Sequence, residues 1–99
     1  MSGKRYKVEL SKRVRKDARR IPTEHRKRIR LALRRLEVDP RGPGTSVLRG
    51  RLAGLTRCRV GDYRIVYRIH DARLHVYVIR MGSRQYIYQS LLRFLSTLT

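Results

Sequence analysis

The sequence contains few cysteines and few acidic side chains, and this composition excludes several classes of protein. Cys58 is the only cysteine among 99 residues, which excludes an internal disulfide and a metal site built from cysteines. It falls on the apolar side of a predicted strand, so we expect a small buried hydrophobic residue rather than a nucleophile.

Long apolar runs are also missing. No N-terminal segment resembles a signal peptide, and no stretch has the length of a membrane span. We therefore expect a cytoplasmic protein that makes no membrane contact. The chain shows no internal repeat and no low-complexity tract. Its length suits one domain, residues 1–99, that buries roughly 65% of the unfolded surface.

Groups that commonly carry catalysis are scarce. The three histidines, His25, His70 and His75, have no carboxylate at metal-ligand spacing. No two of the seven acidic residues are placed to share a site, and Asp62 is better explained as a turn residue. A serine elbow, a phosphate-binding glycine loop and a dinucleotide fingerprint are all absent. We expect neither a metal nor another cofactor.

Positive charge is abundant instead. The chain has 26 lysines and arginines against seven acidic residues, a formal net charge of +19, and most of the basic residues are arginine. Such a charge points to a nucleic acid, an anionic membrane or an acidic protein as partner. Disorder is not expected, because apolar residues make up 40% of the chain and recur in regular patterns.

Several arginines gather in a predicted hairpin over residues 56–69. Gly61-Asp62 is a pair typical of a two-residue turn. If Val60 and Tyr63 flank this turn, Arg59 lies opposite Arg64. By the same register Arg57 faces Val66, and Leu55 faces Arg68. Alternation then places Cys58, Val60, Tyr63, Ile65, Tyr67 and Ile69 on one face, and Arg57, Arg59, Arg64 and Arg68 on the other.

Like charges directly opposite each other destabilise a sheet. A rigid hairpin that keeps four arginines on one face therefore indicates a surface that binds a polyanion.

The remaining periodic segments define an α+β fold. We expect a strand over 5–10, a helix over about 12–21 capped by Ser11, and a second helix capped by Thr23 that extends to about Val38. A central strand over 74–81 and a C-terminal helical tail over 88–99 follow. The result is an antiparallel-rich sheet, made of the N-terminal strand and a three-strand meander. The helical hairpin covers one face of the sheet, and the arginine face is expected to be open.

Arginine and tyrosine are the residues left for chemistry. Arg84 and Tyr88 follow the last strand and could reach the arginine face. Guanidinium groups bind phosphate bidentately, and positive charge nearby favours a phenolate. Such a tyrosine could act as general base toward a ribose hydroxyl, while arginines stabilise the pentacoordinate phosphate. The alternative is that Tyr88 is an interfacial helix residue and that the arginines only bind phosphate.

Three segments together resemble the RelE branch of the RelE/ParE toxins, the toxic halves of bacterial type II toxin–antitoxin pairs. They are residues 48–50, the hairpin 57–69 and residues 78–88, and the helix-helix-hairpin order extends the resemblance over about 5–88. It implies a ribosome-dependent endoribonuclease that cuts messenger RNA without a metal. The implied catalytic residues are Arg57, Arg59, Arg64, Arg84 and Tyr88. The residues expected to contact RNA are Arg49, Arg51, Arg68, Arg80 and Tyr86.

The resemblance also implies partners. A toxin of this kind binds the ribosome and messenger RNA, and a cognate antitoxin with an acidic or amphipathic segment wraps it in a hetero-oligomer. Two alternatives stay open. One is a ParE-like inhibitor of DNA gyrase, although that branch generally lacks the full arginine and tyrosine set. The other is an RNA-binding module without catalysis.

Overall fold

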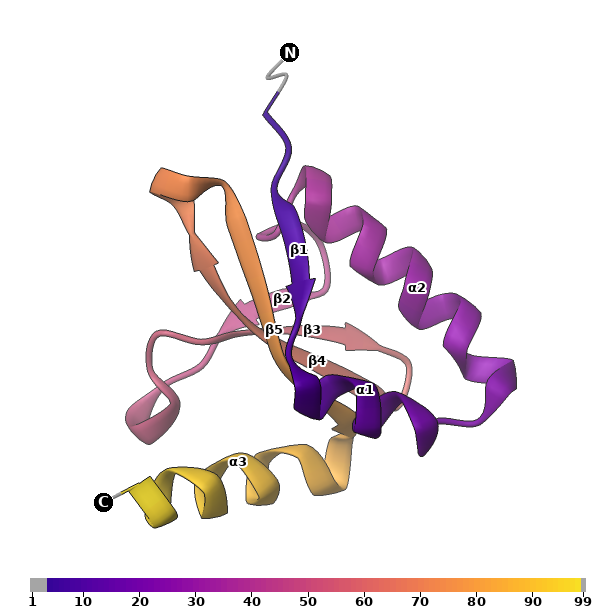
Figure 1. Cartoon of the computed structure of the whole chain (residues 1–99), viewed down its shortest axis with the longest axis vertical. Helices are drawn as coiled ribbons and strands as arrows, with labels where there is room; N and C mark the ends of the chain where they lie inside the picture. The colour runs from indigo at the N-terminus through magenta and orange to yellow at the C-terminus, as the bar shows by residue number, and fades with distance from the viewer. Residues whose placement is uncertain (1–3, 99) are drawn as a thin grey trace.

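The computed structural model describes residues 4–98, including their side chains except those at positions 94, 95, 97 and 98. Within this range a five-stranded sheet has the order β1-β5-β4-β3-β2, with helices on both faces (Figure 1). The α+β class is confirmed. The elements are β1 (Lys7–Leu10), α1 (Lys12–Arg19), α2 (Thr23–Val38), β2 (Thr45–Val47), η1 (Gly50–Leu52), β3 (Thr56–Val60), β4 (Tyr63–His70), η2 (Asp71–Arg73), β5 (His75–Ser83) and α3 (Arg84–Leu98).

The hairpin β3–β4 has most of the predicted register. Val60 pairs with Tyr63, Arg59 with Arg64, and Arg57 with Val66. Thr56 pairs with Tyr67, as the same register requires, but β3 begins at Thr56, so the predicted pairing of Leu55 with Arg68 is not formed. Gly61 has φ of 59°, a left-handed conformation that glycine adopts without steric cost, which explains its place in the turn.

The sheet has one parallel pair and one strand that the sequence did not predict. β1 runs parallel to β5, with Val8 beside Val76 and Leu10 beside Val78. All other pairs are antiparallel, and β5 is internal as expected. The short strand β2 was missed, because its three residues show too little alternation to reveal a strand.

The main core lies between the sheet and the helical hairpin. Val14 of α1 and Leu36 of α2 pack with Ile65, Tyr67 and Val78 of the sheet. Ser11 caps α1 as predicted, accepting a hydrogen bond from Val14 N at 3.2 Å. Thr23 does not cap α2: it is the first residue of the helix, and the N-cap position is Pro22. Cys58 belongs to this core, and burial raises the pKa of its thiol.

The opposite face of the sheet was expected to be open, but the structure shows that it is covered. Helix α3 begins at Arg84, earlier than the predicted 88, and packs across that face (Figure 1). A second core forms there from Leu52, Leu55, Val66, Ile87 and Leu91. Val66 sits among the arginines of β3 and β4 on this face, and it supplies the apolar contact that the helix needs.

A buried ion pair fastens α1 and α3 to β5. The guanidinium of Arg80 donates from Nε to Asp17 Oδ2 at 2.8 Å and from Nη2 to Oδ1 at 3.1 Å. It also donates to the Ser90 hydroxyl. Asp17 Oδ2 accepts a further bond from Met81 N at 3.1 Å. The pairing of β5 with β1 ends at Val78. Beyond that point, the Asp17 carboxylate accepts the hydrogen bond from a backbone N–H of β5 in place of a neighbouring strand.

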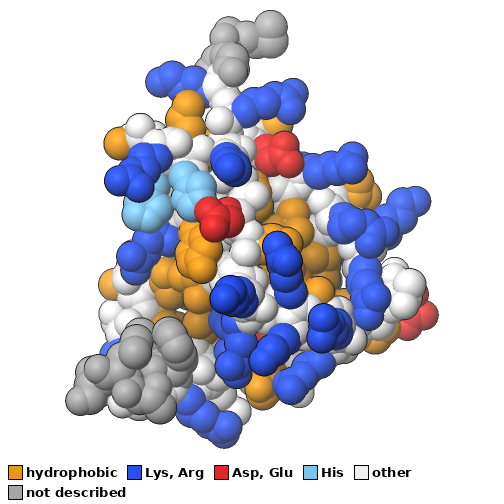
Figure 2. All heavy atoms as spheres, in the orientation of Figure 1, with side chains coloured by type: hydrophobic (Ala, Val, Ile, Leu, Met, Phe, Trp, Pro, Cys, Tyr) orange, Lys and Arg blue, Asp and Glu red, His pale blue; other side chains and the backbone are white. Residues whose placement is uncertain are grey.

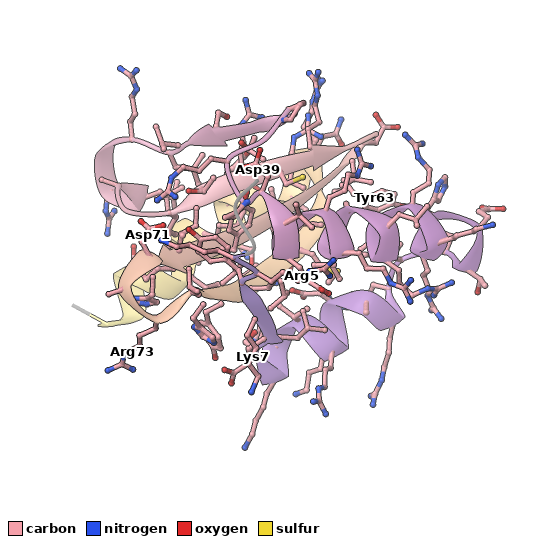
Figure 3. The ribbon with its side chains drawn as sticks, turned by 90° about the horizontal axis from the view of Figure 1, so that it is seen from above. Arg5, Lys7, Asp39, Tyr63, Asp71 and Arg73 are labelled. Carbon is pink, nitrogen blue, oxygen red and sulfur yellow. The ribbon has the colours of Figure 1, made fainter. Side chains whose placement is uncertain are left out.

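A second, exposed polar cluster joins the opposite end of the sheet to its loops. Asp71, labelled beside the β4–β5 turn in Figure 3, accepts two bonds from Arg41 at 2.9 and 2.8 Å. It also accepts one from the Tyr6 hydroxyl at 2.7 Å. The bonds from Arg41, and then from Tyr6, lower the pKa of Asp71 from 3.8 to about 2.

We expect the stabilisation from Arg41 to depend on pH. A carboxyl with a lowered folded pKa stabilises the fold fully above about pH 4 and loses that contribution as the pH falls toward about 2. Arg41→Gln should therefore lower the urea midpoint at pH 7, and its difference from wild type should shrink between pH 4 and 2. Arg30→Gln, on the exposed side of α2, is the control. A difference that stays constant with pH would contradict this assignment.

Candidate functional site

The arginines of the candidate site meet at the β3–β4 turn. Arg59 and Arg64 are direct partners across the hairpin. Arg84 is brought to the same turn because its backbone N donates to Asp62 O at 2.8 Å. The main chain therefore gathers three of the five predicted catalytic residues at one end of the sheet.

The arginines of this turn differ in exposure. Arg59 and Arg84 are exposed, so their guanidinium groups are accessible to a ligand. Arg64 is only 4% exposed, and its Nη1 donates to the carbonyls of Gly61 and Tyr63, both at 2.9 Å. Its Nε is buried with no hydrogen-bond partner among the described residues. Arg57, farther along β3, donates to Ser46 Oγ at 2.8 Å.

Tyr88 and Tyr86 project to different sides of α3. Residues two apart on a helix are separated by roughly 200°. Tyr88 packs against the second core, and its hydroxyl is buried without a hydrogen-bond partner in the described part of the chain. Tyr86 is 42% exposed. The Ser90 hydroxyl, and then Arg80 and Arg20, lower the pKa of Tyr86, so the effect expected of a tyrosine near arginines is present there.

The five residues expected to contact RNA lie in two places. Arg49 and Arg51 are exposed at η1, where Arg51 donates to Ser96 Oγ at 3.4 Å. Arg68 and Tyr86 line a cavity on the far side of α3. Arg80 also lines this cavity, but it is only 5% exposed and its guanidinium is paired with Asp17.

That cavity was not recognised in the sequence. We call it the β4–β5 cavity: an open space of about 860 Å³ between the β4–β5 hairpin and α3, lined among others by Arg68, His70, Arg73, His75, Tyr77 and Arg93. Figure 2 shows two histidines side by side on this part of the molecule, with basic side chains around them. The missed signal is the register across the turn after β4, which places 68 and 70 opposite 77 and 75.

The described part of the chain contains neither a candidate metal site nor a helix that could span a membrane. No group of three or more histidine, cysteine or acidic side chains there could hold a metal ion. Among the same residues, no helix has the length and apolar character needed to cross a membrane.

The fold has counterparts among solved structures. The archaeal RelE–RelB complex from Pyrococcus horikoshii OT3 contains a chain 26% identical, with a TM-score of 0.70 over 82% of this chain and 97% of that one. The RelBE2 toxin–antitoxin complex from Mycobacterium tuberculosis gives 28% identity and a TM-score of 0.61 over 81% and 99%. A mutant RelE toxin from E. coli in the free state shares the fold at 24% identity, with a TM-score of 0.69 over 87% and 92%.

Sequence comparison agrees at the level of the family. A search of curated protein sequences gave no significant match. Residues 8–88 match the family model described as the ParE toxin of the type II toxin–antitoxin system parDE. The match covers most of the chain, including every strand, α1, α2 and the start of α3. The chain therefore belongs to the ParE toxin family of type II toxin–antitoxin systems, within the wider RelE/ParE superfamily.

Proposed function

We propose that this toxin is an endoribonuclease that cuts messenger RNA on the ribosome without a metal. The observation that carries the proposal is the meeting of Arg59, Arg64 and Arg84 at the β3–β4 turn. Arg59 and Arg84 present exposed guanidinium groups at this turn, and such groups suit the charge that develops on a phosphate in the transition state. Arg57 extends the cationic surface along β3.

Tyr88 is our first candidate for the general base, because it packs against the second core, to which Val66, the partner of Arg57, belongs. Its hydroxyl has no access to solvent in this structure, so α3 must shift when the substrate binds. Tyr86 is the second candidate, since it is exposed and its pKa is lowered. Substituting phenylalanine at each position distinguishes them, because only loss of the true base removes cleavage.

A reconstituted translation system containing a chelator tests the function. We expect the wild-type protein to produce messenger RNA cuts in phase with codons and to leave DNA gyrase supercoiling unchanged. Gyrase inhibition with intact messenger would overturn the proposal and favour the second candidate, a gyrase poison, which the name of the matching family model supports. RNA binding without any cleaved product would also overturn it, in favour of a non-catalytic module.

We further propose that an antitoxin with an acidic or amphipathic segment binds this chain in a hetero-oligomer. Solved relatives are described as toxin–antitoxin complexes. A second cavity of about 490 Å³, between α2 and the β2–β3 edge, is lined by Leu31 and Val38 together with Arg28 and Arg35. Leu31 is 49% and Val38 61% exposed, so an amphipathic helix with acidic flanks would cover apolar surface and pair with charge.

A further inference from the structure

Two strands present an aromatic and cationic platform to the β4–β5 cavity. Arg68 is the direct partner of Tyr77, and His70 is the direct partner of His75, so all four side chains share one face. The rings of His75 and Tyr77 lie 6.2 Å apart at an interplanar angle of 18°, and those of His70 and His75 lie 6.2 Å apart at 33°. Three aromatic rings therefore lie next to one another beside a guanidinium group.

The charge of this cavity is not neutralised from within. Arg13, Arg68, Arg73 and Arg93 all line it, and none of the described lining residues is acidic. Arg73 projects outward from the β4–β5 turn in Figure 3. Two carboxylates contact lining residues: Glu9 contacts His75 Nε2 at 2.9 Å, and Asp17 is paired with buried Arg80.

Helix α3 separates most of the cavity from the arginines of the β3–β4 turn. Tyr86, Ser90 and Arg93 line the cavity, and their spacing of four and three residues places them along one side of the helix. Arg84 and Tyr88, also four apart, lie along another side. The cavity is thus a distinct surface on the same face of the sheet, at the end opposite the β3–β4 turn.

We propose that the β4–β5 cavity binds single-stranded RNA, with one or two bases stacked on the Tyr77 and His75 rings and the backbone phosphates held by Arg68 and Arg73. Flat rings interleaved with guanidinium groups match the two parts of a nucleotide, its base and its phosphate. An acidic peptide would need only the charges, and it would leave the aromatic platform unused. The volume also lies in the range of about 300–1,000 Å³ that is typical of small-molecule sites.

This inference deepens the proposed function, because it names a second contact for the RNA that the catalytic site would cut. Its test does not depend on cleavage. The probe is a fluorescein-labelled hexanucleotide of 2′-O-methyl RNA, which lacks the hydroxyl that a cleaving base would attack. Binding is measured by fluorescence anisotropy over a series of salt concentrations.

Tyr77→Leu is expected to weaken binding roughly 5- to 100-fold, the loss that corresponds to one stacked base, whereas Tyr77→Phe should bind like wild type. Arg68→Gln combined with Arg73→Gln should reduce the logarithmic salt slope by about 1.4, or about 0.7 per phosphate. The matched control combines Arg30→Gln with Arg34→Gln on exposed positions of α2. It removes the same charge outside the cavity and should leave the slope within about 0.3 of the wild-type value.

Equal slopes for the cavity pair and the control pair would overturn the proposal, since binding would then follow net charge alone. Unchanged binding by Tyr77→Leu would also overturn it, as would displacement of the RNA by hexa-aspartate at a lower concentration than by unlabelled RNA. Arg68 and Arg73 are exposed, so the arginine pair remains a test if Tyr77→Leu fails to fold. If the wild type does not cut messenger but binding still depends on Tyr77, only the proposed function fails.

Discussion

Replacing Arg84 with alanine is expected to lower the rate of messenger cleavage by about 10²- to 10³-fold, the usual loss when one preorganised donor to the transition state is removed. Arg84 is exposed, and its backbone fixes it to the turn through Asp62 O. The substitution therefore removes an exposed charge at the turn where we propose that the substrate binds, and it should leave the packing of α3 intact. The rate is measured under single-turnover conditions on programmed ribosomes.

Arg30→Ala is the matched control, because it removes one exposed arginine from α2, far along the chain from the turn. It is expected to cut within about threefold of wild type, since only the long-range attraction to RNA changes. Equal rates for Arg84→Ala and Arg30→Ala would show that Arg84 contributes only net charge, and the assigned site would be wrong.

The largest effect on stability is expected at Asp17. Asp17→Asn leaves the buried guanidinium of Arg80 without a carboxylate, and breaking a buried pair in this way typically costs about 3–5 kcal/mol. A domain of this size has a total stability of roughly 5–15 kcal/mol. The variant should therefore unfold at a much lower urea concentration than wild type.

Two further variants show whether the charge itself is responsible. Asp62→Asn, at the exposed β3–β4 turn, should change the free energy of unfolding by less than about 0.5 kcal/mol. Asp17→Leu combined with Arg80→Met removes both charges and should recover much of the loss, because an apolar pair of similar volume avoids the unpaired ion. A double variant no more stable than Asp17→Asn would contradict the assignment of the loss to the unpaired charge.

Helices and strands in which apolar residues recur at a regular spacing could be predicted from the sequence. The register of β3–β4 followed from Gly61-Asp62, and the core face of the hairpin followed from strict alternation, as Cys58, Ile65 and Tyr67 show. The second core was missed for a physical reason. Val66 lies among arginines, and its contacts with Leu52 and Ile87 are made only when distant segments meet.

The positions of some site residues could be predicted from the sequence, and those of others could not. Arg59, Arg64 and Arg84 could be brought together by reasoning from turn geometry and strand order. The burial of Arg80 could not be predicted, because its partner Asp17 is distant in sequence and is fixed only by the position of α1 beside β5. The β4–β5 cavity was missed for a similar reason, since it needs α3 as a wall.

The position of β5 has a consequence for how the protein becomes active. This strand is bonded to β1 on one side and β4 on the other, yet it is the last strand to leave the ribosome. The parallel pairing of residues 7–10 with 75–78 closes a long loop, and such non-local contacts form late. During most of its own synthesis the chain has no complete sheet and no Arg84 at the turn. We therefore expect the candidate site to be incomplete until β5 and Arg84 have been synthesised, so the toxin should not be active before that point.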